Sequence, residues 1–432
     1  MFSKKKDKNR TTKDFDVMIR ISILNSLGFF YLGFLIPVVA KENMDLSALI
    51  VGLIISSLVL GNVFSSSFIG ILTDRVQIKR RLIFLGSLLR GIAYFITYFA
   101  IILNSPILLF LGGFFIGIGA GFFWTPFDTL VAEKSAKEFR SYAYGKRDSA
   151  NAIGQTIGAL FGFSVILILD NFTNNPLLLY SSIIFFGLAN IFAGILFNRK
   201  VDESIKFGDG SFNSSTPSNE ISDSKDDFST ILLVATLILF IVTLLSNINA
   251  NIWRPFVNIY ILEFITGELN VVILIYLPSG IIATLVAPKL GEIMDNINPT
   301  LGIIITSSIG ALLTWLLINV ENLFLFAIII LFDITISLAA GLLFRNILSR
   351  INIKHRGKIL GYTNLSVNLG AIMGPILGGF LWDTFNPKFP FIISIFVELA
   401  LIPLFLVVIR LLSPHMAESF EQKKIKKAEK KV

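Results

Sequence analysis

Among the ionisable residues inside long apolar segments of the chain, four stand out as the first candidates for chemistry: Arg90, Arg254, Asp333 and Glu398. An ionisable group in hydrocarbon costs from about 2.5 to over 10 kcal/mol, so it is retained for a function or a pairing. Asp333 has Ser337 and Gly341 one and two helical turns further on, which gives that face small or polar residues. We expect Asp333 to carry protons and Glu398 to be a second ion-coupling candidate. The alternative is a structural carboxyl that pairs with another helix.

Polar residues also form two stripes at helical spacing. One stripe consists of Thr243, Asn247, Asn251, Arg254 and Asn258, and the other of Asn151, Gln155 and Gly158. Amide side chains have no reason to face lipid, so we expect Asn247, Asn251, Arg254, Asn151 and Gln155 to bind substrate. The alternative is amide hydrogen bonds between helices with no ligand.

The composition excludes several other kinds of site. The 432 residues include no cysteine, which removes disulfides, thiolate metal sites and a cysteine nucleophile. Both histidines, His355 and His415, lie in polar segments. We therefore expect no metal, no cofactor and no enzyme activity. The net charge of +8 is explained by membrane topology, without nucleic acid as a partner.

The elements that must position these residues are long and apolar. Spanning the hydrocarbon core takes roughly 20 apolar residues in a helix. Twelve such runs are present, at residues 17–40, 47–73, 82–103, 107–130, 149–169, 176–198, 229–262, 270–290, 300–319, 323–344, 359–382 and 389–411. The predicted fold class is an all-α integral membrane protein with twelve transmembrane helices. We expect the first run to be retained as a helix, with a cleaved signal peptide as the alternative.

The polar segments divide these runs into two halves. A Ser- and Asp-rich stretch at 199–228 has the composition of a disordered linker between bundles at 17–198 and 229–411, with basic tails at 1–16 and 412–432. Nearly all Lys and Arg residues fall on one side of this topology. The positive-inside rule then places both termini in the cytoplasm and the chain in the cell membrane. The basic tail can contact anionic membrane lipid.

The two halves repeat one another. Arg140, Gly145, Gly154, Gly158 and Gly162 recur 216 positions later as Arg356, Gly361, Gly370, Gly374 and Gly378. Asp74 and Asp295 occupy matching ends of the second and eighth runs. The sequence therefore predicts two pseudo-symmetric six-helix bundles, as in transporters built from repeats. Glycine at every fourth position lets helices pack closely, which we prefer to a ligand-contact role.

Two motifs resemble those of the major facilitator superfamily. The stretch Gly70-Ile-Leu-Thr-Asp74-Arg75-Val-Gln-Ile-Lys79-Arg80-Arg81 is similar to the family's signature loop, although Gln77-Ile78 stands where the family usually has Gly-Arg. Glu133 and Arg140 resemble its acid–base pair. The resemblance implies gating residues that close the cytoplasmic side in one state: Gly70, Asp74, Arg75, Glu133, Arg140, Asp295 and Arg356.

A third motif bears on the direction of transport. The glycine-proline pattern from Gly361 through Gly374-Pro375 to Gly379 is similar to the family's antiporter motif, but it falls in the eleventh run instead of the fifth. We expect a monomeric, proton-coupled transporter that moves a small organic solute by alternating access, with export of an amphipathic compound favoured. The close alternative is uptake of a polar metabolite by a symporter or facilitator. A non-transporting sensor and an intramembrane enzyme are remote alternatives.

Overall fold

The computed structural model describes residues 10–75, 79–136, 139–173, 175–207, 230–349 and 353–412. Twelve of its helical segments are long and apolar enough to cross a membrane, which confirms the predicted all-α membrane fold. Apart from a single bridge between Thr11 and Ser135, the described part of the chain has no β-structure. Contacts group the chain into two units, residues 1–46 with 53–220 (the first unit) and residues 47–52 with 221–432 (the second unit).

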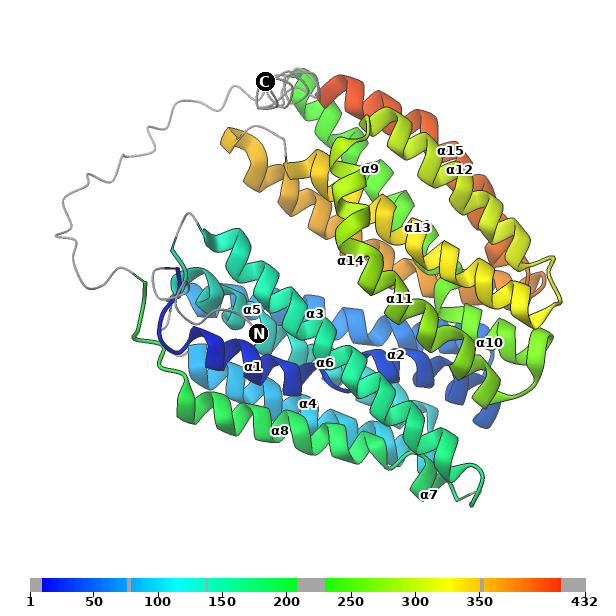
Figure 1. The fold of residues 1–432 in the computed structure, drawn as a ribbon, viewed down its shortest axis with the longest axis horizontal. Helices are drawn as coiled ribbons and strands as arrows, with labels where there is room; N and C mark the ends of the chain where they lie inside the picture. Colours follow the sequence, from blue (N-terminus) through cyan, green and yellow to red (C-terminus); the bar gives the residue numbers. More distant parts are fainter. Residues whose placement is uncertain are drawn as a thin grey trace. The chain divides into compact units, whose positions relative to one another are not determined.

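The first unit holds α1 to α8, apart from the first turn of α3 (Figure 1). Its helices are α1 (Phe15–Ser26), α2 (Phe29–Val38), α3 (Ala48–Arg75), α4 (Lys79–Ile102), α5 (Pro106–Glu133), α6 (Arg140–Leu169), α7 (Pro176–Leu179) and α8 (Ser182–Lys200). The first predicted run is therefore two helices, α1 and α2, interrupted at Leu27–Gly28 and followed by a π-helical turn, Val39–Asn43.

The second unit holds α9 to α15. These helices are α9 (Thr230–Trp253), α10 (Val257–Ile261), α11 (Leu269–Asn296), α12 (Pro299–Leu317), α13 (Leu323–Ser349), α14 (Ile353–Thr384) and α15 (Phe389–Leu412). The seventh predicted run is also interrupted, because a 3₁₀ turn at Arg254–Phe256 separates α9 from α10. Pro255 lies in this turn and lacks the N–H that a continuous α-helix needs there.

Local sequence explains where several helices begin. Ser105, Asn175 and Asn298 each precede a proline at the first position of a helix. The Asn175 side chain accepts a hydrogen bond from the N–H of Leu177 at 3.0 Å, and Asn298 accepts one from Thr300 at 2.9 Å. A capping side chain and a proline with fixed φ together favour helix initiation at these points.

The glycine rows of the two repeats pack in the same way within their own units. A Cβ atom at Gly158 of α6 would lie 1.5 Å from the carbonyl oxygen of Leu27, in the first span. A Cβ atom at Gly378 of α14 would lie 1.8 Å from the carbonyl oxygen of Ile252, in α9. Real Cβ atoms do not approach this closely, so these positions require glycine. The structure thus supports the packing role that the spacing predicts.

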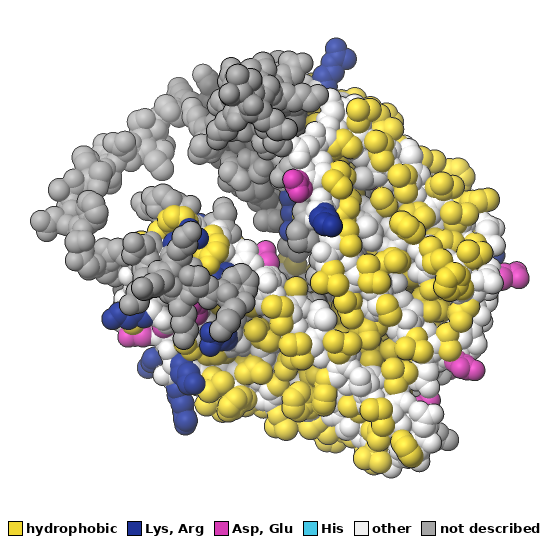
Figure 2. All heavy atoms as spheres, viewed as in Figure 1, with side chains coloured by type: hydrophobic (Ala, Val, Ile, Leu, Met, Phe, Trp, Pro, Cys, Tyr) yellow, Lys and Arg dark blue, Asp and Glu magenta, His cyan; other side chains and the backbone are white. Residues whose placement is uncertain are grey.

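The outer surface of the helices is apolar. Phe64, Phe68, Phe324 and Phe396 each have more than 60% of their surface exposed, and Figure 2 shows hydrophobic side chains spread over the visible helices of the second unit. Exposed aromatic and aliphatic side chains on the outer faces of helices are suited to contact with lipid.

Candidate transport site

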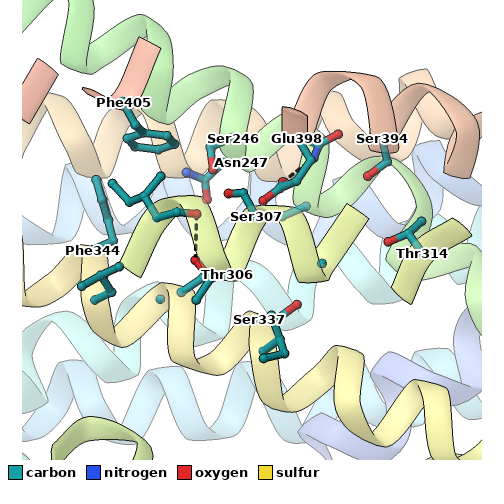
Figure 3. A pocket seen from close by; sticks show the side chains of 18 of the residues that line it. Ser246, Asn247, Thr306, Ser307, Thr314, Ser337, Phe344, Ser394, Glu398 and Phe405 are labelled. Carbon is teal, nitrogen blue, oxygen red and sulfur yellow. Dashed lines mark hydrogen bonds between the residues drawn. The ribbon is translucent and has the colours of Figure 1, made fainter. Parts of the chain in front are cut away.

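The second unit contains a polar cavity of about 260 Å³. It is enclosed by residues of α9, α12, α13 and α15. Hydroxyl and amide side chains line its middle, among them Ser246, Asn247, Thr306 and Ser307. Figure 3 shows Phe344 and Phe405 together on the side of the cavity away from Ser394 and Thr314. The cavity is therefore a polar pocket inside a membrane-spanning bundle, with an aromatic wall at one end.

Two carboxylates line this cavity, Asp333 from α13 and Glu398 from α15. The amide nitrogen of Asn249 donates a hydrogen bond of 2.9 Å to Oε2 of Glu398, and Ser307 lines the cavity beside this carboxylate (Figure 3). Asp333 is 3% exposed, and no described side chain donates a hydrogen bond to it. Glu398 is thus held by a polar partner, whereas Asp333 faces the cavity without one.

Arg254 lies at the helix break between α9 and α10 and also lines the cavity. Its guanidinium is close enough to act electrostatically on both Asp333 and Glu398. It is exposed in the structure, while both carboxylates are largely buried. The helix break at Pro255 therefore places an exposed cation at the edge of a pocket that holds two carboxylates.

The predicted substrate-binding residues do not all lie in the same place in the structure. Asn247 lines the cavity, although its amide nitrogen donates to the Thr243 carbonyl at 2.7 Å. Asn251 does not line it, because its side chain packs against α14, where a Cβ at Gly374 would lie 2.5 Å from Cβ of Asn251. Asn151 and Gln155 belong to α6 in the first unit, hydrogen-bond each other at 3.2 Å, and take no part in this cavity.

Several lining residues were missed by sequence reasoning. Asn249 lies two positions after Asn247, so helical periodicity places it on another face than the stripe that contains Asn247. Thr306 and Ser307 belong to a run of three hydroxyl residues, Thr306-Ser307-Ser308, which does not repeat at helical spacing and so gives no stripe. Predicting these residues requires knowing that α9, α12, α13 and α15 are neighbours, and the sequence alone does not show this.

The gating residues are described only in part. Glu133 is bonded to Lys79, with 2.9 Å between Oε1 and Nζ, and to Lys206 at 4.0 Å. Arg140, its expected partner, is exposed at the start of α6. Gly70 has open space where a Cβ would be. The side chains of Asp74, Arg75, Asp295 and Arg356 lie outside the described residues, as do most of the predicted linker and tails.

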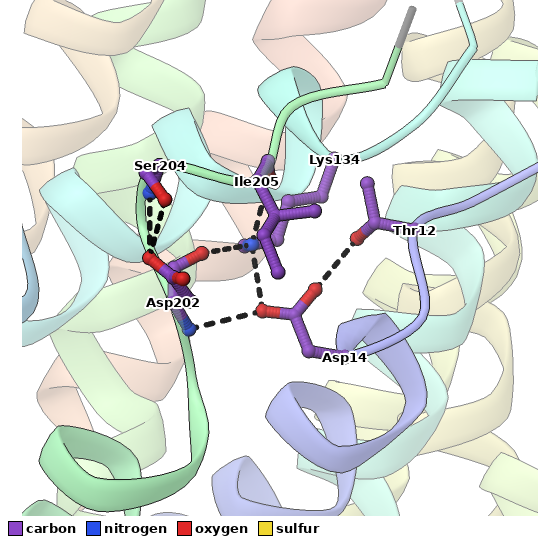
Figure 4. A network of polar contacts seen from close by, with 6 residues as sticks. All are labelled: Thr12, Asp14, Lys134, Asp202, Ser204 and Ile205. Atoms are coloured by element: carbon purple, nitrogen blue, oxygen red, sulfur yellow. Dashed lines mark hydrogen bonds and ion pairs between the residues drawn. The ribbon is translucent and has the colours of Figure 1, made fainter. Parts of the chain in front are cut away.

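A second polar cluster ties three segments together at the end of the first unit where α5 ends (Figure 4). The fully buried Lys134 donates to Oδ2 of Asp14 at 2.7 Å and to the carbonyls of Asp202 and Ile205 at 2.6 and 3.0 Å. Hydrogen bonds from Ser204 lower the pKa of Asp202 below its usual value. Lys134 thus anchors the segment before α1 and the segment after α8 to the end of α5.

Known proteins share this fold and sequence pattern. Residues 20–352 and 239–431 match the sequence model of the Major Facilitator Superfamily. Multidrug resistance protein 2 of Bacillus subtilis (strain 168) is 24% identical over 386 residues, covering 86% of this chain and 90% of that protein.

Two solved structures of membrane transporters are also similar. One is a bacterial homolog of the human lysosomal transporter Spinster in an inward-facing, unoccupied conformation, with a TM-score of 0.75, 13% identity and coverage of 94% of this chain and 99% of the other. The second is the nucleoside transporter NupG, with a TM-score of 0.70, 13% identity and coverage of 92% and 99%. With its twelve spans and a family match over most of its length, this chain belongs to the Major Facilitator Superfamily and is a membrane transporter, not an enzyme.

Proposed function

We propose that this protein is a proton-coupled transporter that exports an amphipathic organic solute by alternating access. One observation carries the coupling: Asp333 and Glu398 line the same cavity within the membrane-spanning part of the second unit. Two carboxylates beside a single guanidinium leave a net negative charge in a medium of low dielectric constant. Binding one proton or one cation balances that charge, which makes the cavity an exchange site.

The hydrogen bonds divide the roles of the two carboxylates. Glu398 accepts a hydrogen bond from Asn249, which fixes the position of its carboxylate in the cavity. Asp333 receives none from the described side chains. In this scheme Asp333 gains and loses the proton, and Arg254 pairs with Glu398 when Asp333 is neutral. Tyr276 is the other titratable group whose charge interacts with Asp333.

The helix breaks supply places where the chain can bend during the cycle. The first and seventh spans are both interrupted, at Gly28 and at Pro255. Discontinuous helices in corresponding positions of two repeats are typical of transporter binding regions. The gate in this scheme consists of the predicted residues Gly70, Asp74, Arg75, Glu133, Arg140, Asp295 and Arg356, with Lys79 added as the partner of Glu133.

Direction and orientation are supported by less specific observations. The curated relative is named a multidrug resistance protein, which favours export. Phe344 and Phe405 give the cavity an apolar end for the hydrophobic part of an amphipathic molecule. The distribution of Lys and Arg favours cytoplasmic termini.

Uptake of a polar metabolite is the second candidate function. The hydroxyls and amides that line the cavity could hydrogen-bond a polar solute, and NupG, a structural neighbour, is a nucleoside transporter. Transport measured in both directions across a membrane with an imposed pH gradient separates uptake from export.

The coupling is tested in proteoliposomes with a pH gradient imposed in either direction. We expect Asp333→Asn to abolish gradient-driven accumulation of a transported dye and to leave counterflow exchange at saturating dye in place, since exchange needs no net proton movement. The matched control is Glu268→Gln, a carboxylate at the start of α11 outside the cavity. Gradient-driven transport that survives in both Asp333→Asn and Glu398→Gln would refute the proposal.

A further inference from the structure

The first unit contains a buried cation without a carboxylate partner. Arg90 of α4 is 1% exposed, and one of its terminal nitrogens donates to Oδ1 of Asn25 in α1. Asn25 in turn donates to the Ser87 hydroxyl at 3.1 Å. Nε of Arg90 has no hydrogen-bond partner among the described residues, and none of the described carboxylates forms an ion pair with it. The Arg90 side chain therefore fills the interior of this bundle and is held by an amide.

Neighbouring glycines leave space for this arginine. A Cβ atom at Gly119 of α5 would lie 2.5 Å from Cγ of Arg90. Residue 119 must therefore lack a side chain where the arginine passes, because a larger residue would displace it. Arg90 itself lies in the third span and contacts the first and fourth spans, and the corresponding seventh, ninth and tenth spans line the cavity of the second unit together with the twelfth.

Helix α12 is the counterpart of α4, since each is the third span of its repeat. Ser87 and Arg90 lie eight and eleven positions after the first residue of α4, Lys79. Ser307 and Gly310 lie eight and eleven positions after the first residue of α12, Pro299. Glycine 310 therefore takes the place of the arginine, and the serine is kept.

The asparagines also correspond. In the first unit, Gly158 packs on Leu27, which lies two positions after Asn25. In the second unit, the repeat partner of that glycine, Gly374, packs on Asn251, which lies two positions after Asn249. Asn249 thus matches Asn25. Its partner is an anion, Glu398, whereas the partner of Asn25 is a cation, Arg90.

The two repeats are complementary in charge and in filled volume. The first repeat has an arginine side chain at this place, and the second has Gly310, a cavity of about 260 Å³ and two carboxylates. A Cβ at Gly310 would meet no atom within 4 Å, so nothing else in the described chain fills that space. The second repeat therefore holds the negative charge and the room that match the side chain found in the first.

We propose that this cavity binds the guanidinium or primary ammonium group of a monovalent organic cation, in the place that the Arg90 side chain fills in the first repeat. The proposal rests on the proposed function, because it names the class of solute whose charge exchanges with the proton. A guanidinium group offers five N–H donors, which the carboxylate and hydroxyl oxygens of the cavity can accept. The volume lies below the range of about 300–1,000 Å³ typical of drug-sized ligands, so the cavity accommodates the charged head and a short chain.

The probe that tests this assignment is n-propylguanidinium, which reproduces the arginine side chain as a free molecule. Its matched control is n-propylurea, which has a similar shape and no charge. Binding to the full-length, detergent-purified protein is measured by isothermal titration calorimetry. We expect n-propylguanidinium to bind and n-propylurea to produce no heat of binding at the same concentrations. Equal binding of the two compounds would overturn the proposal, because the cavity would then select shape alone.

Variants then locate the bound cation. We expect Glu398→Gln and Asp333→Asn each to weaken n-propylguanidinium binding by roughly 10- to 150-fold, the loss of one hydrogen bond to a charged group, and Glu268→Gln to leave it unchanged. Gly310→Arg should abolish binding, because a tethered guanidinium occupies the space, whereas Gly310→Ala should retain it. Binding that is insensitive to both carboxylate variants would place the cation elsewhere and refute the assignment.

The result is separable from the test of proton coupling. If n-propylguanidinium does not bind while Asp333→Asn still abolishes gradient-driven transport of other solutes, the cation assignment fails and the proposed function stands. If the cation binds as expected but no solute moves in response to a pH gradient, the cation site stands and proton-coupled transport fails.

Discussion

Replacing Lys134 by methionine tests the anchor at the end of the first unit. The change keeps a long side chain of similar volume but removes the ammonium group, leaving Asp14 and the carbonyls of Asp202 and Ile205 without their donor. The Lys134 side chain is 0% exposed and that of Asp14 is 11% exposed, so water can reach these groups only in part. Removing one partner of a buried ion pair costs about 3–5 kcal/mol.

A second lysine in the same unit provides the matched control. Lys146 pairs with Asp16 at 3.1 Å, but these two side chains are 21% and 50% exposed. Ion pairs of that kind contribute about 0–1 kcal/mol, because water solvates both charges when the pair is broken. The same substitution, lysine to methionine, is therefore expected to have very different effects at positions 134 and 146.

The assay is thermal unfolding of the purified protein in detergent, followed by tryptophan fluorescence. For a unit of about 200 residues, 1 kcal/mol corresponds to roughly 2–4 °C, so Lys134→Met should lower the melting temperature by roughly 6–20 °C and Lys146→Met by no more than about 4 °C. Asp14→Asn combined with Lys134→Met should be less destabilising than the sum of the two changes. Equal shifts for the two lysine variants would refute the argument that burial makes the Lys134 contacts strong.

Three further outcomes are expected. Gly158→Leu should prevent stable folding, because even a Cβ would lie 1.5 Å from the Leu27 carbonyl oxygen, whereas Gly70→Ala should fold normally in open space; size-exclusion chromatography distinguishes the two. Asn249→Leu should slow gradient-driven transport, because Glu398 loses the hydrogen bond that holds its carboxylate in the cavity; an unchanged transport rate would count against this positioning role. Glu133→Gln should speed the exchange between conformations, measured by single-molecule fluorescence, because it removes the ion pair with Lys79 that belongs to the proposed gate. Unchanged exchange rates would mean that the 2.9 Å contact between Oε1 and Nζ has only a structural role.

Much of the fold follows from the sequence because lipid imposes simple rules. A helix is required wherever a long apolar run crosses hydrocarbon, so run length alone predicted twelve spans. The glycine spacing predicted close packing of corresponding helices in each repeat, and the contacts at Gly158 and Gly378 show it. Charge in an apolar run singled out Asp333, Glu398 and Arg254, and all three line the cavity.

The breaks in the first and seventh spans could be predicted only in part. Pro255 signals the second break, since proline removes a helical donor, but its length and the 3₁₀ turn depend on how α9 and α10 pack. The break at Gly28 has no proline, and the residue there must be glycine because a Cβ would lie 2.5 Å from the Tyr94 ring. The crowding comes from a residue distant in sequence, so only the folded unit reveals it.

The partners of the polar residues were decided by tertiary structure. Helical periodicity shows which residues share a face, but it does not say which neighbouring helix that face meets. Glu133 therefore pairs with Lys79 and not with the residue seven positions along the chain, and Asn249 meets Glu398 across 149 positions of sequence. The sequence alone determined the spans, the repeat and the costly charges. The packing of α9, α12, α13 and α15 decided which of those charges share a cavity. In lipid the hydrophobic effect does not drive helices together, so the sizes of the side chains determine which helices approach closely.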